Sequence, residues 1–280
     1  MNAFIARKGL EISHNIEDYP DGILIAVDKP YRWTSADVIR KVKWAAGKHF
    51  GKKNIKVGHA GTLDPLATGI LIVCIGKATK LAEELQRSPK QYIAGVSFGA
   101  TTPSFDLEKE IDRDYPLDKV SEDALRATLG TFIGEQMQVA PLFSAKSVDG
   151  VRAYEMARKL LKQGNMAAED GILQSSLISI YGMELLSYKD ACMEDTLPSV
   201  NPEDTNDKNS RIHVADISGH TLVRTEILVD CSKGTYIRAL ARDLGEALET
   251  GAFLHSLRRT KNGPFSIDDA LTMEEVAVII

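Results

Sequence analysis

Residues 58–75 read Gly-His-Ala-Gly-Thr-Leu-Asp-Pro-Leu-Ala-Thr-Gly-Ile-Leu-Ile-Val-Cys-Ile. The last six of these residues form an unbroken apolar run, which is typical of a buried strand. Before the run lies a single carboxylate, Asp64, followed by Pro65. Proline disfavours the helical region for the residue before it, so we expect Asp64 in an extended or turn conformation on a stiff loop. An ordinary turn, with Asp chosen for hydrogen bonding to the backbone, explains the same residues equally well.

The segment just before this loop is strongly basic. Residues 40–56 hold seven cationic side chains and no acid, although the whole chain has a net charge of −5. A solvated cationic face explains many charge runs. A complete lack of acids is less ordinary, because solubility favours mixed signs. The run therefore makes a polyanionic substrate such as nucleic acid plausible.

The composition bounds the class of protein. A chain of 280 residues with 44% hydrophobic content can bury a large core. Its longest apolar runs, residues 23–27 and 70–75, fall far short of the ~20 residues that cross a bilayer. We expect no membrane span, no targeting peptide and a cytoplasmic location. The three cysteines are far apart, so we expect free thiols, no disulfide and no metal site.

Periodicity predicts strands and helices in alternation. Helix starts are indicated by Thr34 or Ser35 and by Ser121, which can act as N-caps. Strands are predicted over residues 22–27, 70–75, 91–99 and 221–231, and a helical spacing begins at Ile237. In several strands apolar residues alternate with polar ones, instead of forming an unbroken apolar run. This pattern favours an α+β fold with a mixed, largely antiparallel central sheet and flanking helices. Residues 190–210 are rich in acids and predict a flexible insertion.

Several blocks of this sequence resemble the TruB family of tRNA pseudouridine synthases. The loop of residues 58–69 is similar to the catalytic motif of that family. Other blocks agree in order and spacing: residues 27–30 with 34–35, 90–92, 138–146, 231–238 with 243–245, and 257–259. The resemblance covers about residues 22–265. It implies the catalytic fold of this family as a single domain over residues 1–280, without a full C-terminal PUA domain.

The resemblance implies isomerisation of a uridine in the T-loop of tRNA, at position 55, to pseudouridine. The N1–C1′ bond breaks, the uracil turns, and C5 bonds to C1′. No group is added and nothing is oxidised, so no cofactor is expected. The implied partner is the T-arm of tRNA, with no guide RNA and no membrane, and the protein is expected to be a monomer.

The resemblance also implies roles for residues of this chain. Asp64 is the expected catalytic carboxylate, which attacks the ribose or the base or removes a ribose proton. Tyr92 is expected to stack on the target base, although a core aromatic explains it as well. Tyr236 and Arg238 match a further catalytic block, and Arg238 is expected to pair with Asp64.

Four more residues are expected to bind the substrate. His59 matches a histidine that supports flipping of the base, and Leu257 matches an apolar residue of the uracil pocket. Lys29 and Lys146 are expected to meet tRNA phosphates. A structural histidine and ordinary core packing are the alternative explanations of His59 and Leu257.

One departure from the family pattern follows residue 99, where a second acid and a final glycine are missing from residues 102–109. The contacts of that loop with RNA are therefore expected to differ. Two other hypotheses remain: a catalytically silent tRNA-binding protein, and the catalytic subunit of a guide-RNA-dependent particle.

Overall fold

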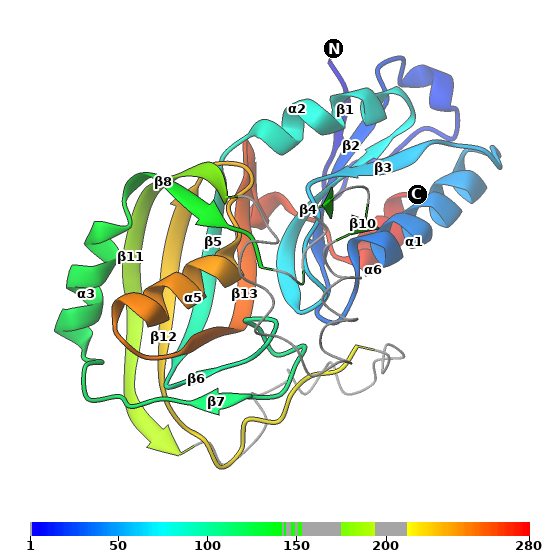
Figure 1. Ribbon diagram of the computed structural model, residues 1–280. Helices are drawn as coiled ribbons and strands as arrows, with labels where there is room; N and C mark the ends of the chain where they lie inside the picture. Colours follow the sequence, from blue (N-terminus) through cyan, green and yellow to red (C-terminus); the bar gives the residue numbers. More distant parts are fainter. Residues whose placement is uncertain (1, 142, 144–146, 149–150, 153–174, 194–211) are drawn as a thin grey trace. The chain divides into compact units, whose positions relative to one another are not determined.

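A computed structural model describes residues 2–141, 143, 147–148, 151–152, 175–193 and 212–280. Helices lie between single strands and runs of several strands along it (Figure 1). The helices are α1 Ser35–His49, α2 Ala82–Arg87, α3 Glu122–Thr131, α5 Ile237–Ala247 and α6 Met273–Ile279. The strands are β1 Phe4–Ala6, β2 Ile23–Lys29, β3 Val57–Ala60, β4 Ala67–Ile75, β5 Lys90–Phe98, β6 Ala100–Thr101, β7 Arg113–Asp114, β8 Gly134–Val139, β9 Ser147–Val148, β10 Val151–Arg152, β11 Ser175–Met193, β12 Thr221–Cys231, β13 Ala252–Asn262 and β14 Phe265–Ser266.

Ten strands are joined in one mixed sheet. Eight follow the order β1-β2-β4-β13-β5-β12-β11-β8, while β3 pairs with β4 and β14 pairs with β13. Two pairs, β1 with β2 and β4 with β13, are parallel. Antiparallel pairing joins β4 to β2 and β3, β11 to β8 and β12, and β13 to β14. The predicted α+β fold with a mixed, largely antiparallel sheet is confirmed.

The chain divides into two compact units. Unit 1 comprises residues 1–93 and 257–280, and unit 2 comprises residues 94–256. Strands β5 and β13 contribute residues to both units. The single catalytic domain expected from the sequence stays a prediction.

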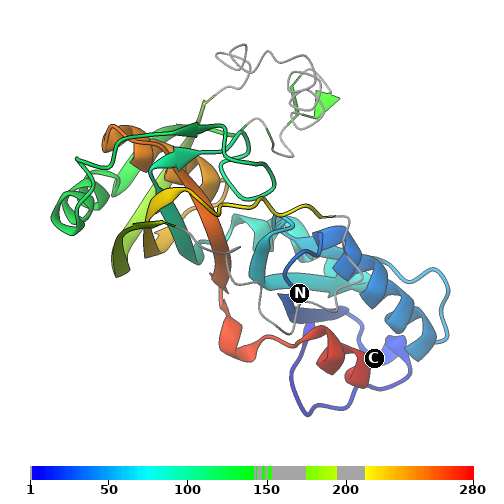
Figure 2. The ribbon, with the colours of Figure 1, turned by 90° about the horizontal axis from the view of Figure 1, so that it is seen from below.

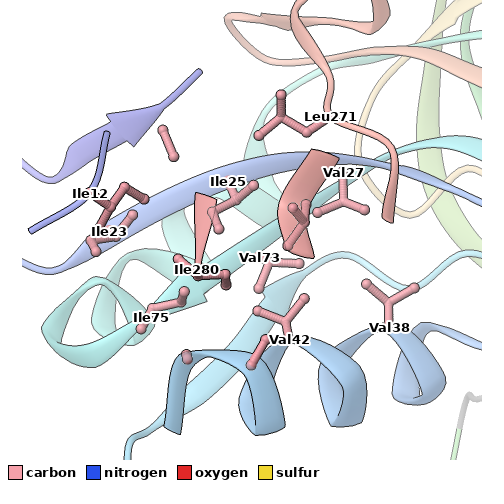
Figure 3. Packing of buried hydrophobic residues seen from close by; sticks show 14 of the residues in the cluster. Ile12, Ile23, Ile25, Val27, Val38, Val42, Val73, Ile75, Leu271 and Ile280 are labelled. Carbon is pink, nitrogen blue, oxygen red and sulfur yellow. The ribbon is translucent and has the colours of Figure 1, made fainter. Parts of the chain in front are cut away.

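The core of unit 1 explains why residues 70–75 are apolar without interruption. Successive side chains of a strand point to opposite faces. Val73 and Ile75 of β4 join Ile23, Ile25 and Val27 of β2 in a cluster with α1 and α6 (Figure 3). The intervening residues Ile70, Ile72 and Cys74 join a second cluster with Phe265. Strand β4 is therefore buried on both faces.

The helices of unit 1 are capped as the sequence indicates. Thr34 and Asp37 form a capping box at the start of α1, in which each side chain accepts a hydrogen bond from the backbone of the other. Val38, Val42 and Ala46 recur at helical spacing and are completely buried. Helix α6 contacts both α1 and β2, and Figure 2 gives a second view of these elements.

Unit 2 is built on the second half of β5. Ile237, Leu240 and Leu244 of α5 pack against apolar residues of β5 and β12, among them Ala94, Val96, Ile227 and Val229. Ser121 caps α3 as predicted, accepting a hydrogen bond from Ala124 N. Strand β11 continues through residues 190–193, which were expected in the acidic insertion. The rest of the insertion, residues 194–210, lies outside the described residues.

The cysteines found in strands behave as small apolar side chains. Cys74 and Cys231 are buried free thiols, and burial raises the pKa of Cys74 to about 11. Cys192 is a half-buried free thiol. The predicted free thiols are confirmed.

The contribution of the apolar cluster in Figure 3 to stability can be tested by substitution. Ile25 is completely buried, so Ile25→Ala removes apolar contacts and leaves a cavity. The free energy of unfolding should fall by about 2–5 kcal/mol in denaturant titration. Leu10→Ala is the control, because Leu10 is 43% exposed and its loss should cost only about 0.5 kcal/mol. Equal losses in the two variants would contradict the packing described here.

Candidate active site

The candidate loop connects two strands of one hairpin. Strand β3 pairs with β4 in antiparallel register, with His59 opposite Val73 and Ala60 opposite Ile72. The structure corrects the predicted bounds of the loop, because residues 58–60 belong to β3 and residues 67–69 to β4. Only residues 61–66 form the connection, so Asp64 lies at its centre with a strand close on each side.

Asp64 occupies the first position of a turn. Ala67 N donates to Asp64 O over 3.1 Å, and Pro65 takes the second position, where its fixed backbone is favourable. The preceding residue, Leu63, is buried, and Ser35 Oγ exchanges hydrogen bonds with both Leu63 N (3.0 Å) and Leu63 O (3.2 Å). The predicted turn conformation is confirmed, and the half-buried Asp64 is held from both sides.

The buried amino group of Lys29 forms a hydrogen bond to the backbone of this turn. Lys29 has no exposed surface, and its Nζ donates to Pro65 O (3.2 Å), Pro30 O (2.9 Å) and Trp33 O (2.5 Å). Burial lowers the pKa of Lys29 to about 7, and the negative charge of Asp64 is the largest influence in the opposite direction. Lys29 was expected to meet a tRNA phosphate. An ammonium enclosed by three carbonyls is not available to one, so Lys29 positions the loop instead.

A buried guanidinium group binds the start of the loop and the strand that follows it. Arg259 of β13 is only 2% exposed; its Nε donates to Ile70 O (2.8 Å) and its Nη2 to Gly61 O (3.1 Å). A buried carbonyl that lacks a donor costs free energy, and Arg259 provides a donor to each of these two. Arg259 therefore ties the start of the loop to the strand that follows it.

Strands β4 and β13 approach each other closely beside the loop. Gly69 lies opposite Arg259 in parallel register and has φ +97°, which side chains rarely adopt. A Cβ atom there would lie 2.2 Å from the backbone oxygen of Arg259. Asp28 Oδ1 accepts from Gly69 N over 3.1 Å, and Arg258 Nη2 lies 2.8 Å from Asp28 Oδ2. Glycine is therefore required at this position.

Three predicted substrate contacts lie in unit 1 with Asp64. Leu257 is half-buried and opposite Ala67 in parallel register, so it borders the end of the loop. Tyr92, 8% exposed, lies near the start of β5, where the neighbouring Gln91 O accepts from Thr260 Oγ1 of β13. His59 is half-buried, and burial together with the charge of Arg259 lowers its pKa. Both influences disfavour the protonated form of the His59 imidazole.

The other two predicted catalytic residues lie in unit 2. Tyr236 caps α5, and the amide of the buried Gln138 binds its backbone, accepting from Tyr236 N (2.9 Å) and donating to Tyr236 O (3.2 Å). Arg238 is 5% exposed and donates to Ser104 O (3.1 Å) and Phe143 O (2.8 Å).

The loop that departs from the family pattern supplies the acid beside Arg238. Asp106 Oδ2 lies 3.5 Å from Arg238 Nη1, and both side chains are buried. The predicted pairing of Arg238 with Asp64 joins residues of different units and stays a prediction. Lys146 lies outside the described residues.

Sequence reasoning did not identify the residues that hold the loop and Tyr236. Ser35 was noted as a possible helix cap, and Arg259 only within a block that resembles the family. Gln138 belonged to a matching block without an assigned role. Two charges in a row, as in Arg258-Arg259, indicate a solvated surface, so the sequence carried no local signal that one of them is buried.

The described residues show neither a metal cluster nor a membrane-spanning helix. They contain no group of three or more His, Cys, Asp or Glu side chains that could hold a metal ion. None of their helices is long and apolar enough to cross a membrane.

Comparison with solved structures shows a shared fold. A crystal structure of the archaeal box H/ACA sRNP Nop10-Cbf5 complex matches 92% of this chain with a TM-score of 0.55 and 23% identity. A Cbf5-Nop10-Gar1 complex matches 99% of it with a TM-score of 0.60 and 24% identity. The chain spans 53% and 60% of the length of those chains. The chain therefore shares its fold with the matched chains of these complexes.

Sequence comparison gives the family. Residues 48–197 match the model of the TruB family pseudouridylate synthase N-terminal domain, and residues 238–280 match the tRNA pseudouridylate synthase B C-terminal domain. A tRNA pseudouridine synthase B from Phocaeicola vulgatus is 44% identical over 257 residues, 92% of each chain. One from Streptomyces avermitilis is 37% identical over 92% of this chain and 73% of its own. The chain belongs to the TruB family of pseudouridylate synthases.

The close approach of β4 and β13 at Gly69 can be tested by adding a methyl group there. Gly69→Ala should cost several kcal/mol of unfolding free energy and shift β4 against β13, because the new methyl group meets backbone atoms. Gly9→Ala is the matched control, since Gly9 also has a positive φ (+78°) but nothing within 4 Å of its Cβ position. That control carries only the conformational cost, about 1–2 kcal/mol. Equal costs, measured by denaturant titration, would rule out the steric role of Gly69.

Proposed function

We propose that Asp64 is the carboxylate with which this chain converts uridine 55 of tRNA to pseudouridine. Membership of the TruB family supports the reaction and its substrate. The observation that supports Asp64 is its position at a turn whose flanking backbone is bound by Ser35, Lys29 and Arg259. A catalytic group must be held within a fraction of an ångström to act efficiently. The backbone around Asp64 is held in this way by side chains from strands β2 and β13 and from helix α1.

The reaction is an internal rearrangement of one nucleotide. The N1–C1′ bond breaks and a C5–C1′ bond forms, after which the proton on C5 moves to solvent or to a base and N1 gains a proton. Atoms and charges balance without an added group. Asp64 would attack C1′, attack the base, or remove the proton from C2′, and each route needs an ionised carboxylate beside an extruded base.

The other proposed catalytic residues supply what a detached uracil requires. Tyr92 offers an aromatic face for stacking and a hydroxyl group that can assist removal of the C5 proton. Arg238 is proposed to keep Asp64 ionised and oriented through their opposite charges. Tyr236, with its backbone fixed by Gln138, is proposed to border the same nucleotide.

Residues His59 and Leu257 are proposed to contact RNA bases rather than move protons. A neutral imidazole can stack or hydrogen bond in the place that an extruded base leaves, at no cost of burying a charge. Leu257, at the end of the loop, would provide an apolar wall for uracil. Lys146 is proposed to meet a phosphate.

The partner is proposed to be the T-arm of tRNA alone. Curated relatives that match over nine tenths of their length are named as tRNA enzymes, which supports tRNA as the substrate. We further propose that the protein acts as a monomer in the cytoplasm, without a guide RNA or a cofactor. A silent tRNA-binding protein would not need Asp64, Tyr92 and Arg238 together, so their presence favours the enzyme.

Mapping of pseudouridine in unmodified tRNA transcript tests this proposal. The wild-type protein, with no RNA added except the transcript, should form pseudouridine at position 55. Asp64→Ala and Asp64→Asn should lower the rate by at least about 10⁴-fold, as loss of a catalytic nucleophile or base does. Affinity for tRNA should stay within about threefold of wild type, because phosphate contacts dominate binding.

The control is Asp269→Ala, which removes an exposed carboxylate of the same unit and should leave the rate unchanged. Product formed by Asp64→Ala would overturn the role of Asp64. Binding without product in the wild-type sample would favour the silent protein, and product only after addition of a guide RNA would favour the guided enzyme.

A further inference from the structure

The outward face of α1 presents a large aromatic side chain between lysines. Trp44 is 65% exposed, whereas Val42 and Ala45 on the inner side are buried. Lys41, Trp44 and Lys48 are spaced by three and four residues, so they share one face of the helix. The Nζ atom of Lys41 lies 6.0 Å from the centre of the Trp44 ring, and that of Lys48 lies 5.6 Å from it. We call these three residues the Trp44 platform.

The surroundings of the Trp44 platform are positive. Among the described residues, the ion pairs of segment 40–56 are those of Arg40 with Asp37 and of Lys52 with Glu17. Five further cations of this segment are exposed: Lys41, Lys43, Lys48, Lys53 and Lys56. An indole ring within a field of this sign can stack on a nucleobase while the lysines meet the adjacent phosphates.

Helix α1 connects the Trp44 platform to the candidate loop. Ser35, the first residue of α1, forms the two hydrogen bonds that hold Leu63 beside Asp64. Trp44 follows nine residues later, which corresponds to about 13–14 Å along the helix axis. All these residues belong to unit 1. An RNA that places a uridine at Asp64 can therefore reach Trp44 with a nearby nucleotide.

Other partners fit this face less well. A helix that inserts into a membrane surface needs a broad exposed apolar face, but the apolar residues of α1 other than Trp44 are turned toward the core or partly buried. The cores of protein–protein interfaces are depleted in lysine. The density of lysines around one exposed aromatic ring favours RNA.

We propose that the Trp44 platform is a second RNA contact, in which Trp44 stacks on an unpaired base of the tRNA other than the target uridine and Lys41 and Lys48 bind its flanking phosphates. This inference rests on the proposed tRNA substrate. It adds a stacking site to the phosphate contacts that a basic segment alone would provide. The site would increase affinity without taking part in the chemical step.

Affinity for full-length tRNA transcript tests the Trp44 platform. Trp44→Ala should raise the Kd roughly 5- to 100-fold, the range for loss of one base–aromatic stack. Trp44→Phe keeps an aromatic face and should stay within about threefold of wild type. Lys41→Gln with Lys48→Gln should lower the slope of log Kd against log salt by about one to two. Val278→Ala, which removes apolar surface from a residue of α6 that is 85% exposed, is the control and should bind as wild type.

Fluorescence gives an independent measure of stacking. The chain has two tryptophans, so the signal lost between wild type and Trp44→Phe belongs to Trp44. That component should be quenched when tRNA is added. A wild-type Kd in Trp44→Ala, or no quenching of Trp44, would overturn the inference. A change in sedimentation of Trp44→Ala at unchanged tRNA affinity would also overturn it, because it would make the platform a contact between copies of the chain.

The outcomes separate this inference from the proposed function. Wild-type protein that binds tRNA through Trp44 but forms no pseudouridine would refute the proposed function and leave the Trp44 platform standing. Wild-type protein that forms pseudouridine, with Trp44→Ala binding tRNA as wild type does, would refute only the platform.

Discussion

The candidate site depends on two cations buried beneath one short loop. Backbone carbonyls that water cannot reach need hydrogen-bond donors from the protein. Lys29 gives its donors to Pro65 and two other carbonyls, and Arg259 gives its donors to Gly61 and Ile70. A buried charge is expensive unless it is paired and hydrogen-bonded. The carboxylate of Asp64 favours the charged form of Lys29, whereas burial and the charge of Arg259 disfavour it.

The fold makes this arrangement possible by placing the loop between strands that are themselves fixed. Strand β4 is buried on both faces and carries the end of the loop, while β13 carries Arg259 and approaches β4 at Gly69. Helix α1 adds the bonds from Ser35. Sequence segments more than 190 residues apart therefore determine where one side chain lies.

Patterns of short range in the sequence predicted much of this fold. The apolar run at residues 70–75, the cap at Thr34, and the strand and helix on either side of residues 232–236 all follow from local periodicity, and all are present. Asp64 was singled out because proline restricts the residue before it. Strand β13 was missed, because Arg258, Arg259 and Lys261 give it the composition of a solvated segment.

The hydrogen bonds of Lys29 and Arg259 to the loop could not be predicted, because charged residues are usually exposed. Burial of Lys29 and Arg259 depends on carbonyl groups that only the folded chain brings together. The sequence shows a lysine in a motif, and a phosphate contact is the simplest use for it. The structure instead gives Lys29 a place under the turn, where it acts on Asp64 through the backbone.

Single-turnover kinetics of Lys29→Met with saturating tRNA transcript would test this account most directly. If Lys29 positions Asp64, the rate of pseudouridine formation should fall by about a hundredfold, the effect of a displacement near 1 Å, while the Kd for tRNA stays within about threefold of wild type. Lys8→Met, a change at a lysine whose side chain is 80% exposed, should alter neither quantity. An unchanged rate with a weakened Kd would contradict the account and return Lys29 to the role of a phosphate contact.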